Sequence, residues 1–283
     1  MSTAVLIVNY HAYAELRRCL TSLIPYIGSD DEVVVVDYEG DEHALGRAVE
    51  GGVPVLTLPR PDNLGFAAGV NLAARQTRAP FLLLLNPDTI VEGPVVRALE
   101  DWMRSHPEVG VAGPRVLNSD GTIQPSARRF PDITTLFGGR TTWLTSRFPN
   151  NWFSRRNLVG VDAAAPIDVD WVSGACFMTR RDVFETIGGF DESFFLYWED
   201  ADYCRRVAEA GFRCTYVQAT SVRHAGGISA EHDRASAIRA FHRSAFRLYW
   251  KHASWLARLG APAVGGGLWL RGEWRARRAA RRS

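Results

Sequence analysis

The chain has 283 residues, of which 46% are hydrophobic, and its formal net charge is +2. This length allows one sizeable hydrophobic core with room for a small appendage. The near-neutral charge excludes the global positive field that is typical of nucleic-acid-binding proteins, so no nucleic acid partner is expected. Charge is uneven, however, because six arginines and one glutamate gather in RGEWRARRAARRS at 271–283.

The cysteines and the apolar runs bear on location. No cysteine stands in a CxxC pair or at metal-ligand spacing: Cys19, Cys176, Cys204 and Cys214. This predicts buried, reduced thiols and a reducing, cytoplasmic environment. The opening run AVLIV is much shorter than the apolar region of a signal peptide. The stretch at 255–270 is interrupted by Arg258 and glycines, and it falls short of the roughly 20 apolar residues of a spanning helix.

Short apolar runs alternate with helical patterns through the first 106 residues. The apolar runs predict buried strands at 4–9, 32–38, 53–59 and 81–86. Helical periodicity predicts helices at 15–27, 42–52, 66–78 and 94–106, the second of them closed by its glycines. Apolar strands separated by helices indicate an α/β fold with a parallel sheet covered on both faces.

The second half of the sequence is less regular. It predicts strands at 109–117, 169–180 and 213–218, and helices at 181–188 and 199–211. Residues 118–168 are rich in polar, proline and aromatic residues, which predicts a long loop or a few short elements. From about residue 230 the pattern is helical and basic. We therefore expect one α/β domain over 1–226 and a C-terminal helical, basic appendage over 227–283.

Polar residues follow the predicted strands at their carboxyl ends. Asn9 and Tyr10 follow the first strand, Asp37 the second, and Asn86-Pro87-Asp88 the fourth. Ligands of open α/β sheets bind beyond these ends. The pattern therefore predicts a ligand crevice, with an ordinary β-turn as the alternative for Asp88.

Several catalytic and nucleotide-binding motifs do not occur in the sequence. There is no GxGxxG after the first predicted strand, no GxxxxGK[ST], no GxSxG and no HExxH. The absence of these motifs argues against a dinucleotide-binding enzyme, a P-loop NTPase, an α/β-hydrolase and a zinc protease that would carry them. Acidic and amide residues at strand ends remain, together with one histidine, His224 in RHAGG.

Five stretches together resemble family 2 glycosyltransferases of the GT-A fold, and most of all the bacterial rhamnosyltransferases. They occur in the family's order: VLIVNYHAY (5–13), PDNLGFAAGVNLA (61–73), LLLLNPDT (82–89), VDWVSGACFMTRRDVFETIGGFDESFFLYWEDADYCRRVAEAGF (169–212) and RHAGG (223–227). The resemblance implies a mostly parallel, Rossmann-like sheet flanked by helices. It also implies an enzyme that takes a sugar from a nucleotide-diphosphate donor.

The resemblance further implies a divalent cation, Mn²⁺ or Mg²⁺, which neutralises charge on the donor diphosphate. Asp88 matches the last acid of the family's DxD motif, and His224 matches the histidine that commonly completes the metal site. The first position of the motif is Asn86 here, whose amide suits a hydrogen bond to the sugar or ribose. For His224 the alternative is a structural surface histidine.

On the same resemblance, Asn9, Tyr10 and Asp37 hold the nucleoside, with Asp37 accepting from a pyrimidine N–H. The family usually continues DNxSxDGS after this point, whereas this chain continues YEGD at 38–41. The identity of the base therefore stays open between dTDP-linked and UDP-linked donors.

A second group of residues matches the loop and helix start that face the donor: Asn63, Gly65, Gly69 and Asn71. Glycine in such a loop lets the backbone approach a ligand closely. An ordinary turn followed by an ordinary helix is the alternative for this segment.

Glu199-Asp200 matches the family's ED motif. In an inverting displacement one carboxylate deprotonates the acceptor hydroxyl, and Asp200 is our candidate for that base. Asp202 would point about 160° away from Asp200 around the helix. We expect Asp200 to stay ionised, because a helix N-terminus favours negative charge. The alternative is that these acids only complement the helix dipole.

The remaining pocket candidates for the acceptor or sugar are Trp171, Ser173, Gly174, Trp198 and Glu199. Arg128 or Arg129, in SARRF at 126–130, could contact phosphate.

The expected activity is inverting transfer of a sugar, foremost L-rhamnose from dTDP-rhamnose, to a carbohydrate or lipid-linked glycan. A UDP-hexose donor is the alternative within this class, and a non-catalytic GT-A domain that binds glycan or nucleotide is the alternative outside it. The tail pairs tryptophan and leucine with arginine, as in segments that lie on an anionic leaflet, here the inner face of the cell membrane. A packed helix, or one that forms a homodimer, is the other interpretation of the tail.

Overall fold

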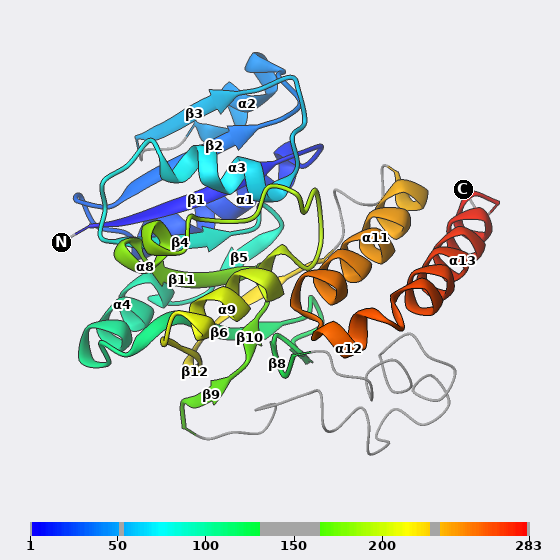
Figure 1. The fold of residues 1–283 in the computed structure, drawn as a ribbon. Helices are drawn as coiled ribbons and strands as arrows, with labels where there is room; N and C mark the ends of the chain where they lie inside the picture. The colour runs from blue at the N-terminus through cyan, green and yellow to red at the C-terminus, as the bar shows by residue number, and fades with distance from the viewer. Residues whose placement is uncertain (1, 51–53, 131–164, 227–232, 282–283) are drawn as a thin grey trace.

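The computed structural model describes residues 2–50, 54–130, 165–226 and 233–281. The glycines expected to close the helix at 42–52, and most of the irregular segment 118–168, lie outside these ranges. Within them the chain forms an α/β domain with a pair of long helices at one side (Figure 1).

The centre of the molecule is one curled sheet with the path β3-β2-β1-β4-β11-β6-β12-β5. Strands β1 to β4 run parallel, whereas β11 pairs antiparallel with both β4 and β6. β12 then runs parallel to β6. The expected α/β class is confirmed. The strand bounds are β1 Thr3–Asn9, β2 Glu32–Asp37, β3 Val55–Pro59, β4 Phe81–Leu85, β5 Thr89–Val91, β6 Val109–Leu117, β7 Ile123–Gln124, β8 Ala127–Arg128, β9 Ile167–Val169, β10 Trp171–Val172, β11 Cys176–Arg180 and β12 Arg213–His224.

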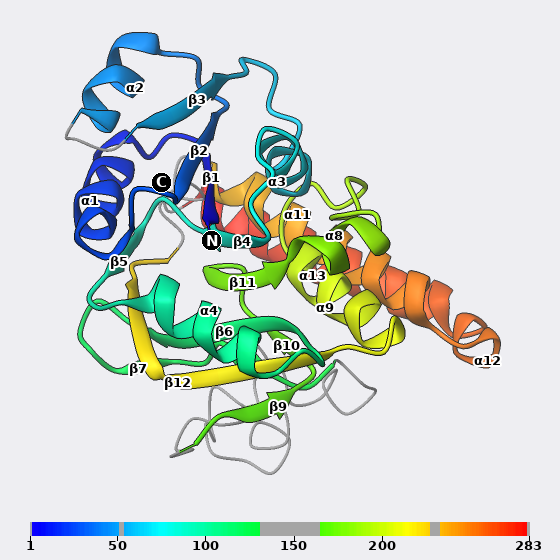
Figure 2. The same cartoon turned by 90° about the vertical axis from the view of Figure 1, so that its left-hand side faces the viewer.

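Helices cover both faces of the sheet (Figure 2). Helices α1, α2 and α4 pack on one face, and α3, α8 and α9 pack on the other. The helix bounds are α1 Tyr13–Leu23, α2 Glu42–Val49, α3 Phe66–Ala74, α4 Val95–Ser105, α8 Arg181–Thr186, α9 Glu199–Glu209, α11 Arg234–His252, α12 Trp255–Arg258 and α13 Ala261–Ala280.

The strands are apolar along their length because helices cover both faces of the sheet. In β4, Leu82 and Leu84 belong to the core under α3 and α9, whereas Phe81, Leu83 and Leu85 belong to the core under α1 and α4. Because successive side chains of a strand point to opposite faces, a strand buried on both sides must be apolar at every position. All five residues of β4 are buried.

Two expectations for the second half differ from the structure. The single strand expected at 169–180 is interrupted at 173–175, because β10 pairs with β8 in a separate two-stranded sheet and β11 belongs to the central sheet. The strand expected at 213–218 continues to His224, because its second half pairs with β5, a short strand that the sequence pattern did not predict. This extension brings His224 beside the end of β4.

The C-terminal helices form a layer of their own. α11 packs beside α9, and its Leu248 belongs to the core of the α/β domain. α13 packs on α11, on the far side from the sheet (Figure 1). Among the described residues, no helix is both long enough and apolar enough to cross a membrane.

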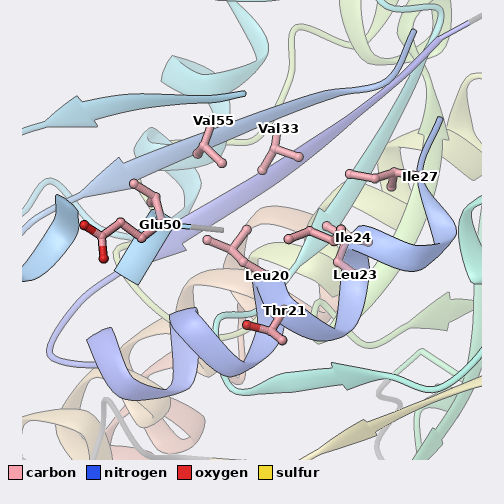
Figure 3. Close-up of a pocket in the computed structure, with 9 residues that line it drawn as sticks. Leu20, Thr21, Leu23, Ile24, Ile27, Val33, Glu50 and Val55 are labelled. Carbon is pink, nitrogen blue, oxygen red and sulfur yellow. The ribbon is translucent and has the colours of Figure 1, made fainter. Parts of the chain in front are cut away.

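A small hollow lies between α1, β2 and β3 (Figure 3). Leu20, Val33 and Val55 point into it, and about 10 Å³ of space remains between these and neighbouring side chains. That volume holds about one water molecule at most. Val33 and Val55 lie at the amino ends of their strands, opposite the edge where Asn9 and Asp37 lie. The hollow is therefore not part of the candidate site.

Candidate active site

The carboxyl ends of β1 and β2 are joined through Asp37. One of its carboxylate oxygens accepts from Asn9 Nδ2 at 2.7 Å, and the other accepts from the Tyr13 hydroxyl at 2.8 Å and from Gly40 N at 3.0 Å. Asn9 and Asp37 are both fully buried. In this arrangement Asp37 orders the edge of the crevice and presents no exposed oxygen to a nucleoside. Tyr10, next to Asn9, is partly exposed.

The loop before α3 is shaped by a close backbone contact. Gly65 has φ +93°, and a Cβ at this position would lie 2.4 Å from the carbonyl oxygen of Phe195. The preceding turn is held by Asn63 Oδ1, which accepts from Gly65 N at 2.9 Å. Glycine is therefore needed at 65 so that this loop can lie against the segment that leads into α9.

Two other candidates on α3 have packing contacts. A Cβ at Gly69 would meet the methyl groups of Val8 at 2.8 and 2.9 Å, so glycine lets α3 lie close to β1. The amide of Asn71 donates to Phe190 O and Glu192 Oε1 at 2.9 Å and accepts from Phe190 N at 2.9 Å. Its polar atoms hold the turn after α8, which differs from the donor contact expected for Asn71.

Asp88 and His224 meet where β4 and β12 end. Asp88 Oδ1 lies 3.1 Å from His224 Nε2, and the two side chains are only 8% and 12% exposed. The other Asp88 oxygen accepts from Gly226 N at 3.1 Å. Asn86 Nδ2 lies 3.4 Å from the same His224 nitrogen. The structure therefore brings together the two residues expected at the metal site, Asp88 and His224, and Asn86, which was expected to bond to the sugar or ribose.

Gln124 fixes which nitrogen of His224 faces this cluster. The Nδ1 atom of His224 lies 2.9 Å from Gln124 Oε1, while Gln124 Nε2 donates to Asn118 Oδ1 at 3.0 Å. The acceptor at Gln124 requires a proton on Nδ1, which leaves the Nε2 lone pair of a neutral imidazole directed at Asp88. Metal-binding histidines are commonly oriented in this way by a second hydrogen bond.

The pair fits a divalent cation. A neutral imidazole nitrogen and a carboxylate oxygen are two acceptors, and a cation between them removes the repulsion. Two neighbouring ligands of an octahedral cation, with bonds of about 2.1 Å, stand about 3.0 Å apart. The observed separation is 3.1 Å. No group of three or more His, Cys, Asp or Glu that could hold a metal occurs among the described residues. Phosphate oxygens and water would supply further ligands of such a cation.

A short loop links this pair to the acidic start of α9. Within residues 173–175, Ala175 O accepts from Asn86 N at 3.0 Å, and Gly174 N donates to Asp200 Oδ2 at 2.9 Å. Ser173 N in turn donates to Ser126 O at 2.8 Å. The loop between β10 and β11 therefore contacts both the end of β4 and Asp200.

The two acids at the start of α9 have altered acidity. Burial raises the pKa of Asp200, although hydrogen bonds from Gly174 N and Ala201 N and the charge of Arg128 oppose this. Burial, followed by the charge of Asp200, raises the pKa of Glu199 well above its usual value. Glu199 Oε2 is buried and has no hydrogen-bond partner within the described part of the chain. Burial thus outweighs the helix N-terminus, which was expected to keep Asp200 readily ionised. The result is a carboxylate of higher basicity.

The backbone just before these acids is strained. Tyr197 and Trp198 have φ values of 67° and 70°, which side chains of this size rarely adopt. Such strain concentrates at functional sites, where the surrounding structure holds it. The Trp198 ring lies 6.1 Å from that of Trp171 and 5.3 Å from that of Phe241 on α11. Its Nε1 is buried and has no hydrogen-bond partner among the residues that the structure describes.

Of the two arginines considered at 128 and 129, only Arg128 is directed toward this region. Its guanidinium lies 5.0 Å over the ring of Trp171, and its charge acts on Asp200. Arg129 pairs with Asp170 at 3.0 Å. Sequence reasoning missed Tyr13, Gln124 and Phe241. Tyr13 ends the matched stretch 5–13, but the roles of all three depend on contacts with residues farther along the chain.

The comparisons with known proteins decide the family. The model described as "Glycosyltransferase like family 2" matches residues 2–249. The chain belongs to this family. A Mycobacterium tuberculosis relative, "N-acetylglucosaminyl-diphospho-decaprenol L-rhamnosyltransferase", is 30% identical over 99% of this chain and 94% of its own length. The chain is thus a family 2 glycosyltransferase that resembles the rhamnosyltransferases, as the sequence analysis predicted.

Solved structures agree on the fold of this glycosyltransferase. GalNAc-T7 with UDP, GalNAc and Mn²⁺ superposes with a TM-score of 0.60 at 16% identity, over 79% of this chain and 44% of that one. The mannosyltransferase PcManGT from Pyrobaculum calidifontis, in complex with GDP-Man and Mn²⁺, gives 0.57 at 18% identity, over 99% and 75%. The GT-A architecture is thereby confirmed.

Proposed function

We propose that this glycosyltransferase moves L-rhamnose from dTDP-rhamnose, with inversion at the anomeric carbon, to a hydroxyl of a lipid-linked glycan. The sugar and the acceptor class are supported by similarity, over nearly the whole chain, to a relative named for that transfer. The chemistry is supported mainly by one geometric observation. The 173–175 loop bonds both to Asp200 and to Asn86 N, two residues before the Asp88 that pairs with His224.

In this proposal Asp88 and His224 hold a divalent cation, Mn²⁺ or Mg²⁺, together with the donor diphosphate. When bound, such a cation supplies positive charge that stabilises the leaving diphosphate. Asn86, whose amide nitrogen lies 3.4 Å from His224 Nε2, donates a hydrogen bond to the sugar or ribose in this proposal. Asn63 and Gly65 shape the donor side of the crevice through the turn against Phe195.

Asp200 acts as the base. Its Oδ2 atom accepts from Gly174 N, which fixes the carboxylate beside the loop, and the raised pKa makes it a better proton acceptor than an exposed aspartate. The acceptor hydroxyl transfers its proton to Asp200 as its oxygen bonds to the anomeric carbon and the diphosphate departs from the opposite face. Trp171 and Trp198 provide apolar and indole surfaces on which a sugar ring can lie.

Two measurements test this proposal: which nucleotide binds, and which anomeric configuration the product has. Thermal shift with dTDP, UDP or GDP, each with Mn²⁺, should show the largest stabilisation for dTDP, because at equal concentration the ligand that binds more tightly stabilises the folded state more. Transfer from dTDP-rhamnose to a GlcNAc-diphospho-lipid should then give a product of inverted configuration. A larger shift with UDP would assign a UDP-sugar donor, and retention of configuration would remove Asp200 from the base role.

A further inference from the structure

Large apolar side chains are exposed together on the last two helices. The exposed fractions are 73% for Trp255 and 74% for Leu259 at α12, and 63% for Leu270 and 61% for Trp274 on α13. Leu256 and Trp269 are also more than half exposed. Single exposed apolar residues are common on protein surfaces, but a gathering of this kind marks an interaction surface.

The exposed side of α13 is not the side that packs on α11. Its packed side carries small residues: Ala261, Gly272 and Ala276 are buried, and a Cβ at Gly272 would lie 3.2 Å from the His242 side chain. The exposed side carries Leu270 and Trp274, and the spacing of 3.6 residues per turn continues the same stripe through Arg277 and Arg281. We name this stripe, together with Trp255, Leu256 and Leu259 of the α12 turn, the tail face.

The tail face is flanked by positive charge. Residues 253–283 contain seven arginines and a single acid, Glu273. That acid is paired with Arg239 of α11 at 2.8 Å. Two arginines lie against tryptophan rings of this region, Arg258 at 5.2 Å from Trp250 and Arg278 at 5.5 Å from Trp274. Apolar and cationic groups are thus presented side by side.

We propose that the tail face docks on an anionic lipid bilayer. Tryptophan and leucine side chains enter the boundary between headgroups and acyl chains, and the arginines pair with lipid phosphates. The charge of the face is complementary to such a surface. No described helix can span the bilayer, so the helices lie on it. The opposite side of α11 reaches the active site, because Phe241 contacts Trp198 and Ser244 Oγ donates to Leu196 O at 2.9 Å.

Docking would therefore hold the aromatic end of the active site close to a lipid surface. The placement of the active site near lipid rests on the proposed transfer to a lipid-linked acceptor. The docking of the tail face does not depend on that transfer. Vesicle binding is measured without donor or acceptor, so failure of the docking and failure of the proposed transfer are distinguishable.

The experiment is flotation of the full-length protein with vesicles of phosphatidylcholine containing 30% phosphatidylglycerol or none, each at low and high salt. Each arginine near an anionic surface strengthens binding by about five-fold. Arg277→Glu with Arg281→Glu should therefore weaken binding to the anionic vesicles at least 25-fold. Leu270→Glu with Trp274→Glu should also weaken it, and Leu56→Glu, at an exposed leucine of β3, is the matched control.

Binding that needs the anionic lipid, falls with salt and is lost in both double variants but not in the control supports the proposal. Equal vesicle binding by all variants overturns it. The proposal is also overturned if sedimentation shows a lipid-free dimer that the double variants convert to monomers, because the tail face would then be a contact between two copies. Unchanged melting temperatures of the variants exclude unfolding as the cause of lost binding.

Discussion

At the scale of single residues, Gln124 is the contact that sets the tautomer of His224. Its Oε1 accepts from His224 Nδ1 at 2.9 Å, so the opposite nitrogen faces Asp88. Gln124→Ala should lower the affinity for Mn²⁺ in the presence of dTDP by about 10–100-fold, the usual effect of losing such a partner. Titration calorimetry, or electron paramagnetic resonance of unbound Mn²⁺, measures this directly and without turnover.

Two further variants serve as the positive and the negative control for this measurement. Asp88→Asn, which removes a ligand, should weaken Mn²⁺ binding more strongly than Gln124→Ala. Gln76→Ala, at an exposed glutamine beyond α3, should leave it unchanged. Wild-type Mn²⁺ affinity in Gln124→Ala, alongside loss in Asp88→Asn, would show that His224 needs no such support.

Asp200 gives a prediction about pH. Because burial raises the pKa of Asp200 and the unprotonated form is the base, the transfer rate should rise with pH through that raised pKa. Glu199 lies next to it and is also raised, so the midpoint belongs to the pair rather than to either acid. Asp200→Asn should reduce turnover by about 10²–10⁴-fold and remove this rise.

The donor side provides the control for Asp200. The affinity for dTDP, measured by calorimetry, should change little in Asp200→Asn, because Asp200 bonds to Gly174 N, whereas Asp88 and His224 contact each other beyond the end of β4. Near-normal turnover of the variant, with an unaltered pH profile, would show that another group takes the proton.

The residues of the site were predictable in unequal measure. Asp88, His224 and Asp200 stand in short motifs, so the sequence alone identified them, and their roles remain predictions. The burial of Asp37 was not predictable, because it depends on Tyr13 and Gly40 closing over the carboxylate. The same holds for Asn71, whose amide is taken up by a turn more than 100 residues later. Long-range hydrogen bonds leave no periodic trace in a sequence.

Between secondary-structure elements, Asp202 of α9 joins α11 to α9 through ion pairs. It is completely buried and pairs with Arg206 at 2.9 Å, Lys251 at 2.8 Å and His252 at 2.9 Å. Burial alone would raise the pKa of Asp202, but these partners hold it below its usual value. The stabilisation is therefore complete above the ordinary pKa of an aspartate, about 3.9. It is lost as pH falls through the lowered pKa.

Asp202→Asn should therefore destabilise the protein at neutral pH. Breaking a buried ion pair by removing one partner typically costs about 3–5 kcal/mol, because the other charges lose their counter-ion. Denaturant unfolding at pH 7 measures this loss. Glu209→Gln, which removes a more exposed acid near His252, should cost less than about 1 kcal/mol. Equal stability of the two variants would show that the pairs contribute nothing to holding α11.

Elements were predicted best where their pattern is complete on its own. The strands and helices of the first 106 residues were found because each is periodic over its whole length. The extension of β12 to His224 was not, because its partner β5 has only three residues. The interruption at 173–175 was not predicted, because β10 and β11 lie directly before and after it and the three segments look like one strand in the sequence.

At the scale of the whole molecule, the boundary expected at residue 226 can be tested by truncation. A chain of residues 1–254 keeps α11 and the partners of Asp202, so it should fold and bind dTDP. A chain of residues 1–226 leaves Asp202 buried with Arg206 alone among those partners, so it should melt at a lower temperature or aggregate. Thermal unfolding of the two chains checks this, and equal melting temperatures would uphold the expected boundary.

The position of β11 in the sheet has a consequence for synthesis on the ribosome. β4 ends at Leu85, but its partner β11 begins at Cys176, so β4 must wait for most of another hundred residues to be translated. During that interval a nascent chain that has joined β1 to β3 presents FLLLL as an open edge, the kind of strand that pairs with other chains. Pausing translation before residue 176 should therefore favour aggregation or capture by a chaperone, whereas pausing once residues 176–180 have emerged from the ribosome should not.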